Sequence, residues 1–134
     1  MNWNYISGFF DADGSVSISK VHKNGLRTPV ISFHNTKLNI LEDIQQFILI
    51  EINIKGFISI KPAKKDTHTT SYDLKYVYFP KCLALIDNIS SIHPKKIYRF
   101  NIIKEMFKYT HRQGKYTMEM LNKREELEKL FFTP

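Results

Sequence analysis

The chain has 134 residues, with 20 Lys and Arg against 13 Asp and Glu, so its formal net charge is +7. This length predicts a single domain over residues 1–134, because domains most often have about 100–150 residues, and a hydrophobic content of 43% excludes global disorder. The single cysteine, Cys82, excludes an intrachain disulfide and a cysteine-cluster zinc site.

Charge and hydrophobic patterning also indicate which partners and which location to expect. A basic surface attracts polyanions, so nucleic acid is the first partner to expect. No apolar stretch reaches the roughly 20 residues of a spanning helix, so we expect no membrane partner. The opening residues lack the basic region and small-residue cleavage site of a signal peptide, and we therefore expect an intracellular protein.

The first elements are predicted from a change of hydrophobic period. Apolar residues recur at helical spacing over residues 2–12, and Gly14 ends this helix. From Ser15 the period changes to two, and the Asn24-Gly25 pair is a strong hairpin signal. Two antiparallel strands are therefore predicted over residues 15–23 and 26–35.

The second half repeats this helix, strand, strand order. Thr36 is the expected N-cap of a helix that ends near Glu51, although the alternating isoleucines within residues 47–60 also fit a strand. Phe57 begins a third strand, and residues 72–78 form a fourth. Pro80, Pro94 and Thr117 then open three helices. The predicted order is α-β-β-α-β-β-α-α-α.

Residues 6–14 read Ile-Ser-Gly-Phe-Phe-Asp-Ala-Asp-Gly and carry the chemical signal. Gly8 and Ala12 are four residues apart on one helix face, which lets another helix backbone approach closely. Asp11 and Asp13 stand at the C-terminal end, where the helix dipole makes a carboxylate unfavourable by about 0.3–1 kcal/mol. Concentrated negative potential suits a divalent cation, because hard cations prefer carboxylate and carbonyl oxygens.

This segment also has two simpler interpretations. Asp-Ala-Asp-Gly is also a common polar turn with glycine in the left-handed position. An EF-hand loop counted from Asp11 fails, because Val16 stands where glycine is needed and His22 where glutamate is needed.

In its context, the segment resembles the motif of the LAGLIDADG homing endonucleases. The residues identical to the motif name are Gly8, Asp11, Ala12, Asp13 and Gly14. The departures are Ser7 for the first alanine and Phe9 and Phe10 for aliphatic residues. The α-β-β-α-β-β-α order extends the resemblance over roughly residues 3–110.

The resemblance implies an α+β fold of the αββαββα homing-endonuclease type, with a saddle-shaped antiparallel sheet and additional C-terminal helices. It implies a site-specific DNA endonuclease that hydrolyses both strands of a long, near-palindromic target with Mg²⁺, for which Mn²⁺ is a substitute. Chains with one motif act as homodimers in this family. The implied partners are therefore double-stranded DNA and a second copy, with a dimer interface at Ser7, Gly8, Asp11 and Ala12.

Two questions stay open under this resemblance. The alternative function is an RNA maturase, with RNA as a partner, or a non-cleaving DNA-binding protein on the same fold. Members of the family are often encoded in organellar or microbial introns. The expected location is therefore either an organelle or a microbial cytoplasm, and the sequence does not decide between the two.

The catalytic and metal-binding roles are carried over by position. Asp13 falls on the metal-binding acid of the family, with the Ala12 and Gly14 backbone as additional oxygen donors, whereas Asp11 is expected to be structural. Lys96 and Lys37 lie where the family places basic or polar residues near the metal, and an ammonium there offsets developing phosphate charge. If Lys96 does not take this role, Lys95 is the next candidate for it.

One face of the predicted sheet is expected to read the DNA. A strand of about 10 residues spans about 33 Å, close to one turn of duplex, and its polar side chains alternate with apolar ones that pack on the helices. The predicted DNA contacts are Ser15, Ser17, Ser19, Lys23, Asn24, Arg27, Thr28, Ser32, His34, Ser59, Lys61, Lys64, Lys65, Asp73 and Lys75. Without the motif, the same pattern fits an ordinary solvated sheet. The charged run 123–129 is expected to be a solvated helix face.

Overall fold

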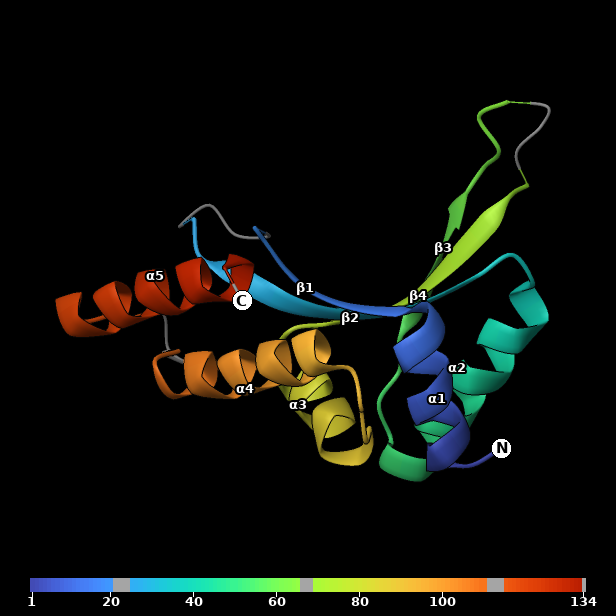
Figure 1. Cartoon of the computed structure of the whole chain (residues 1–134), viewed down its shortest axis with the longest axis horizontal. Helices are drawn as coiled ribbons and strands as arrows, with labels where there is room; N and C mark the ends of the chain where they lie inside the picture. Colours follow the sequence, from blue (N-terminus) through green and yellow to red (C-terminus); the bar gives the residue numbers. More distant parts are fainter. Residues whose placement is uncertain (21–24, 66–68, 111–114, 134) are drawn as a thin grey trace.

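The computed structural model describes residues 1–20, 25–65, 69–110 and 115–133. Its elements follow the predicted order and form an α+β fold (Figure 1). They are α1 (Trp3–Asp13), β1 (Gly14–Lys20), β2 (Arg27–Asn35), α2 (Leu38–Ile52), β3 (Phe57–Lys61), β4 (Ser71–Val77), α3 (Phe79–Asn88), α4 (Pro94–Lys108) and α5 (Met118–Phe132). None of the described helices is both long and apolar enough to cross a membrane.

The four strands form one antiparallel sheet in the order β1-β2-β4-β3. The neighbours β1 and β2 pair with each other, as do β3 and β4, and the two pairs join at the centre where Phe33 lies opposite Leu74. The sheet is curved, with β1 and β3 rising on opposite sides of its middle (Figure 1). The expected saddle-shaped antiparallel sheet is confirmed.

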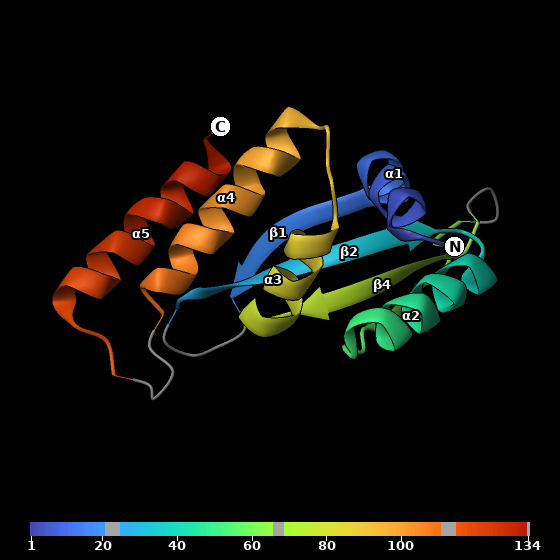
Figure 2. The same ribbon diagram turned by 90° about the horizontal axis from the view of Figure 1, so that it is seen from below.

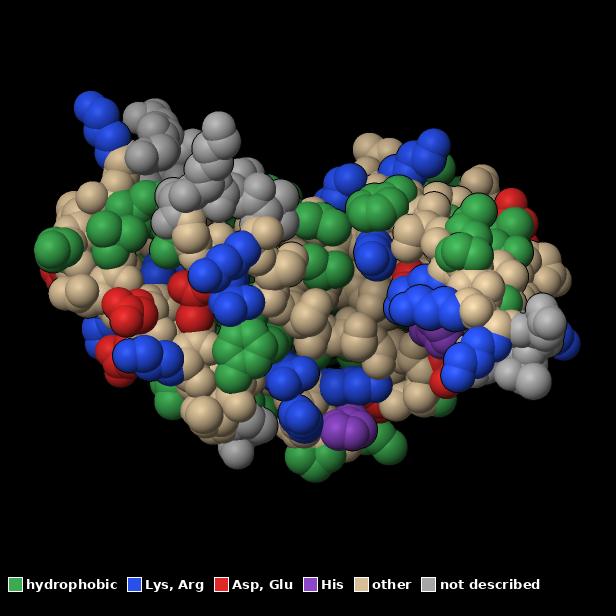
Figure 3. Space-filling view, turned by 90° about the horizontal axis from the view of Figure 1, so that it is seen from above, with side chains coloured by type: hydrophobic (Ala, Val, Ile, Leu, Met, Phe, Trp, Pro, Cys, Tyr) green, Lys and Arg blue, Asp and Glu red, His purple; other side chains and the backbone are tan. Residues whose placement is uncertain are grey.

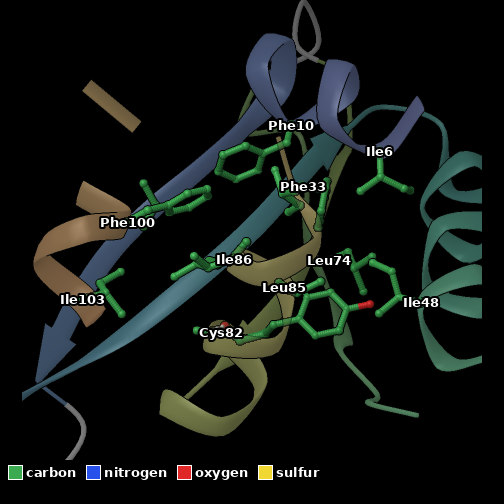
Figure 4. Packing of buried hydrophobic residues seen from close by; sticks show 14 of the residues in the cluster. Ile6, Phe10, Phe33, Ile48, Leu74, Cys82, Leu85, Ile86, Phe100 and Ile103 are labelled. Atoms are coloured by element: carbon green, nitrogen blue, oxygen red, sulfur yellow. Dashed lines mark hydrogen bonds between the residues drawn. The ribbon is translucent and has the colours of Figure 1, made fainter. Parts of the chain in front are cut away.

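Helices α1 to α4 cover one face of this sheet, and α5 packs beside α4 (Figures 1 and 2). Alternate strand residues point toward the helices, as the period of two predicted. The six that were predicted to pack on the helices are buried: Val16, Ile18, Ile31, Phe33, Leu74 and Tyr76. Phe10 of α1 stacks on Phe100 of α4 with ring centroids 5.4 Å apart, and meets Phe33 edge-on at 5.9 Å (Figure 4). Aromatic packing therefore fixes α1 over the middle of the sheet.

The ends of α2 differ slightly from the prediction. Its N-cap is Lys37 rather than Thr36, and the side chain of Asn35 accepts a hydrogen bond from the Lys37 backbone N–H at 2.8 Å. At the other end, Asn53 takes the left-handed conformation, with φ of 54°. The alternating isoleucines up to Ile52 therefore belong to the helix and not to a strand, and the left-handed Asn53 ends the helix before β3 begins.

The solvated face predicted over residues 123–129 of α5 is confirmed for Lys123, Glu125, Glu126 and Lys129, which are exposed, but Arg124 is an exception. Arg124 is only 1% exposed. Its Nη1 donates to Thr110 Oγ1 at 2.8 Å, and its Nη2 donates to the Arg27 carbonyl oxygen at 2.7 Å. The Arg27 backbone N–H in turn donates to Glu128 Oε1 at 3.0 Å. Helix α5 is therefore bound to the first residue of β2.

Candidate functional site

The face of the sheet opposite the helices is open and hollowed, and Figure 3 looks down on it. The hollow has a volume of about 710 Å³ and is lined by all four strands and by the last residue of α1. We call it the open face. Its lining residues are Asp13, Ser15, Ser17, Ser19, Val30, Ser32, His34, Phe57, Lys61, Asp73, Lys75 and Val77.

Most strand residues predicted to contact DNA share this face. The structure brings together Ser15, Ser17, Ser19, Ser32, His34, Lys61, Asp73 and Lys75. Ser59 lies opposite Asp73 in the antiparallel register and therefore points to the same side of the sheet. Lys64 and Lys65 are exposed just after β3. Lys23 and Asn24 lie outside the described residues.

Two predicted contacts at the start of β2 are altered by α5. Thr28 is 4% exposed and lies with Tyr116 and Arg124 around a small pocket, so its assignment to the DNA-reading surface is wrong. Arg27 is partly exposed, but its Nε lies 3.7 Å from Glu128 Oε1 and its guanidinium lies 5.0 Å from the Phe132 ring centroid. The strand period gave no sign that a distant helix covers this end of β2.

The two carboxylates at the end of α1 have different environments. Asp11 accepts hydrogen bonds from Ser91 Oγ at 2.5 Å and from the Ile92 backbone N–H at 2.8 Å, so it fixes the segment before α4. Asp13 is exposed at the edge of the open face. These contacts fit the structural role expected for Asp11, and Asp13 is the carboxylate available to a ligand.

Lys96 lies beside this acidic end. Its Nζ donates to the carbonyl oxygens of Phe10 at 2.7 Å and Asp11 at 3.0 Å. Burial lowers the pKa of the Lys96 ammonium below its usual value, although the nearby charges of Asp11 and Asp13 oppose that shift. Lys37 is exposed at the start of α2, and no hydrogen bond of its ammonium joins it to the described part of this cluster.

The donor set at Asp13 does not form a closed metal site. Among the described residues there is no group of three or more His, Cys, Asp and Glu side chains that could hold a metal ion. Beside Asp13, Ala12 is exposed and Gly14, the first residue of β1, is half-buried. Mg²⁺ commonly uses one or two carboxylates with waters and substrate phosphates. The residues present fit an ion whose other ligands come from outside this chain.

The predicted dimer face of α1 is only partly exposed. Ser7 is 7% exposed, donates to the Trp3 carbonyl oxygen and accepts from the Ser90 backbone N–H, so its assignment to the interface is wrong. Asp11 is likewise bonded within the subunit. Gly8 and Ala12 are exposed, and a Cβ atom added at Gly8 meets nothing within 4 Å. These two small residues remain available to a neighbouring helix.

Asp73 is the centre of a charged cluster on the open face. It is 5% exposed, and its two oxygens bind His34 Nδ1 at 2.8 Å and Lys61 Nζ at 2.9 Å. Burial alone would raise the pKa of its carboxyl, but hydrogen bonds and positive charge from Lys61 and His34 outweigh that effect and lower it. Asp73 therefore holds its two neighbours in place and offers no free carboxylate.

Three apolar residues that lie on the open face were not predicted from the sequence. Val30, Phe57 and Val77 line the hollow among the polar side chains. The signal was present in the alternation, because Val30 and Ser32 are two residues apart and share a strand face. Apolar groups on such a surface can contact the methyl group of thymine.

Solved structures with the same fold include three complexes with DNA. The meganuclease I-AabMI, bound to uncleaved DNA, matches at 20% identity and a TM-score of 0.67, covering 96% of this chain and 44% of its own. I-CvuI, in complex with the I-CreI target in the presence of Mg with the DNA not cleaved, matches at 13% identity and a TM-score of 0.68, covering 98% and 80%. I-GzeII, in complex with its DNA target, matches at 16% identity and a TM-score of 0.60, covering 98% and 41%.

This chain thus spans less than half the length of I-AabMI and I-GzeII. No curated protein matches its sequence. The model of the LAGLIDADG-like domain matches residues 2–131, with the exposed Asp13 at the end of the motif helix, and the chain therefore belongs to the LAGLIDADG family.

Proposed function

We propose that the chain is a site-specific, Mg²⁺-dependent endonuclease that cuts both strands of a long, near-palindromic DNA target as a homodimer. Each subunit contributes one acidic metal ligand, Asp13. The observation that carries the proposal is the position of this exposed carboxylate, at the end of the motif helix and at the edge of the polar open face.

The open face supports DNA as the substrate. Its serine, histidine and lysine side chains stand on adjacent strands of a curved sheet, a shape that can follow the major groove (Figures 1 and 3). The net charge of +7 favours a polyanion. The three solved relatives are complexes with DNA. We expect the affinity to fall steeply with salt concentration, because phosphate contacts release counterions.

Two features of the single chain support self-association: one exposed carboxylate at the site, and small exposed residues on α1. The described residues place a single exposed carboxylate at this site, whereas cutting two strands needs a site at each scissile phosphate. Exposed Gly8 and Ala12 on the same helix allow two α1 helices to pack closely, which would bring two Asp13 side chains together.

The chain's own residues then have separate tasks. Asp13, with the Ala12 carbonyl, would hold the Mg²⁺ ion, which when bound activates water and relieves charge on the leaving oxygen. Lys96 places a positive charge beside Asp13, where it offsets the charge that develops on the phosphate. Asp11 fixes the segment before α4 and so positions Lys96, and the strands orient the duplex.

Asp13→Asn tests the proposal, because it removes the charge and keeps the shape. Duplexes selected by binding from a randomised pool would be incubated with Mg²⁺, and binding would be measured with Ca²⁺. We expect the wild type to cut both strands and Asp13→Asn to bind without cutting. Asp43→Asn, a matched change at an exposed acid of α2, should cut normally.

Two outcomes would contradict the proposal. Normal cleavage by Asp13→Asn would remove Asp13 as the metal ligand. Binding of the wild-type protein to intron RNA with promotion of splicing, and no cleavage of any selected DNA, would favour the maturase function.

A further inference from the structure

His34, Asp73 and Lys61 form a cluster across three neighbouring strands. His34 lies on β2, Asp73 on β4 and Lys61 on β3, and all three line the open face. The Asp73 carboxylate is 2.8 Å from His34 Nδ1 and 2.9 Å from Lys61 Nζ. Because Asp73 is almost fully buried while the His34 side chain is 47% exposed, the cluster presents the imidazole ring to whatever occupies the hollow.

The contact with Asp73 fixes which ring nitrogen carries the hydrogen. An ionised carboxylate only accepts hydrogen bonds, so His34 Nδ1 must be the donor. The pKa of the Asp73 carboxyl is lowered by Lys61 and His34 despite its burial, which keeps it ionised at neutral pH. In the neutral ring, Nε2 therefore carries a lone pair, and it has no hydrogen-bond partner within the described part of the chain.

We propose that His34 reads one base of each half-site and that Asp73, as a positioning residue, sets whether His34 accepts or donates the hydrogen bond. The inference rests on the DNA-binding function proposed above. With the neutral ring, Nε2 accepts a hydrogen bond from an exocyclic amine. In the major groove these amines are N6 of adenine and N4 of cytosine.

Protonation reverses this preference. A charged ring carries a hydrogen on Nε2 as well, so it donates to O6 or N7 of guanine, to O4 of thymine or to N7 of adenine, and it no longer accepts from cytosine. Histidine ordinarily changes its charge between about pH 5 and 8, whereas lysine and aspartate keep theirs. The charged groups that face the ring across the open face are Asp73, Lys61, Lys75 and Asp13.

The experiment selects duplexes from a randomised pool at about pH 5.5 and about pH 8.5, on either side of the ordinary histidine range, with Ca²⁺ in place of Mg²⁺. On the strand that His34 contacts, we expect one position per half-site to accept cytosine or adenine at high pH, and to lose cytosine and gain guanine or thymine at low pH. One hydrogen bond predicts a change of about 3- to 10-fold in relative affinity.

Three variants separate base reading from general binding. His34→Gln can both donate and accept at either pH, so we expect the pH dependence at that position to disappear. Asp73→Asn removes the charge that favours the protonated ring, and we expect the change in base preference to require a lower pH than in the wild type. Ser17→Ala, elsewhere on the open face, should leave the pH dependence at the His34 position intact.

The outcomes distinguish this inference from the proposed function. Enrichment of one target with the same bases at both pH values would overturn the reading role of His34 and leave the DNA-binding function standing. Failure to enrich any duplex would overturn both. If thermal melting shows that Asp73→Asn does not fold, the wild-type pH series and His34→Gln still decide the role of His34.

Discussion

The Lys96 side chain closes the carboxyl end of the helix that carries Phe10. Its Nζ lies 2.7 Å from the Phe10 carbonyl oxygen and 4.9 Å from the centroid of the Phe10 ring. The last carbonyl groups of a helix lack intrahelical partners and carry partial negative charge, so an ammonium group is stabilising there. The same contact holds the Lys96 ammonium group next to Asp11 and Asp13. One side chain therefore serves both helix stability and the electrostatics of the candidate site.

Lys96→Met should separate these two effects, because methionine keeps much of the apolar stem and removes the charge. We expect the free energy of unfolding to fall by about 1–2 kcal/mol, the scale of a hydrogen bond from a charged group that is partly exposed. Cleavage should fall about 100-fold or more, as when one donor to a developing negative charge is removed. Urea unfolding and single-turnover cleavage measure the two effects.

The control for Lys96→Met is Lys95→Met, one residue earlier on the exposed side of α4. It removes the same charge without touching α1, so stability and cleavage should stay close to the wild type. Equal losses in both variants would show that general positive charge, rather than the contact with α1, explains the effect.

Asp73 should make the stability of the protein sensitive to acid. Although burial opposes it, the contacts with Lys61 and His34 lower the pKa of this carboxyl below 3.8 in the folded state. The unfolded chain therefore binds the proton more readily, and the stabilisation is present at neutral pH and is lost as the pH falls through the folded-state pKa. We expect Asp73→Asn to be about 1–2 kcal/mol less stable at pH 7, with a smaller difference at low pH.

Urea unfolding of wild type and Asp73→Asn at several pH values between neutral and about pH 3 checks this coupling. Asp43→Asn, at an exposed carboxyl of α2, is the matched control and should show little difference at any pH. A constant difference between wild type and Asp73→Asn at every pH would contradict the role of the ionised carboxylate.

The order of the elements could be predicted because its signals are local. Gly14 and Pro94 stand at element ends in the structure as the sequence indicated. The alternation that begins at Ser15 correctly separated the helix-packed face from the open face. The motif itself was also local, since residues 6–14 are consecutive.

The failures concern what covers a residue, which spacing along one element does not show. Ser7 shares a helix face with small residues by period, yet the segment containing Ser90 packs against it. Thr28 has the correct strand parity, yet Arg124 lies over its end of β2. Both contacts join residues more than 80 positions apart, so they depend on the tertiary fold.

A side chain at Gly14 should be destabilising because it would clash with Phe10, and not because of the backbone conformation of Gly14. Its φ of −98° and ψ of 167° are available to any residue, but an added Cβ atom would lie 2.3 Å from Phe10 Cδ1 and 2.6 Å from the Phe10 carbonyl oxygen. Backbone cannot move aside as an exposed side chain can. We expect Gly14→Ala to lower the free energy of unfolding by about 1–3 kcal/mol, measured by urea unfolding. Stability equal to the wild type would show that α1 and β1 can separate at this junction without cost.

Gly8 is the opposite case and tests the proposed dimer. A Cβ atom there meets nothing within 4 Å, so within one subunit Gly8→Ala should stabilise α1 by about 0.5–1 kcal/mol, the usual cost of glycine inside a helix. In the proposed homodimer, the same position would face the partner helix, where a larger side chain would keep the two backbones apart. We therefore expect Gly8→Leu to shift sedimentation from dimer to monomer, while Asn39→Leu, an apolar change at an exposed position of α2, leaves the dimer intact. A Gly8→Leu protein that self-associates like the wild type would place the dimer interface elsewhere, and with it the pairing of the two Asp13 side chains.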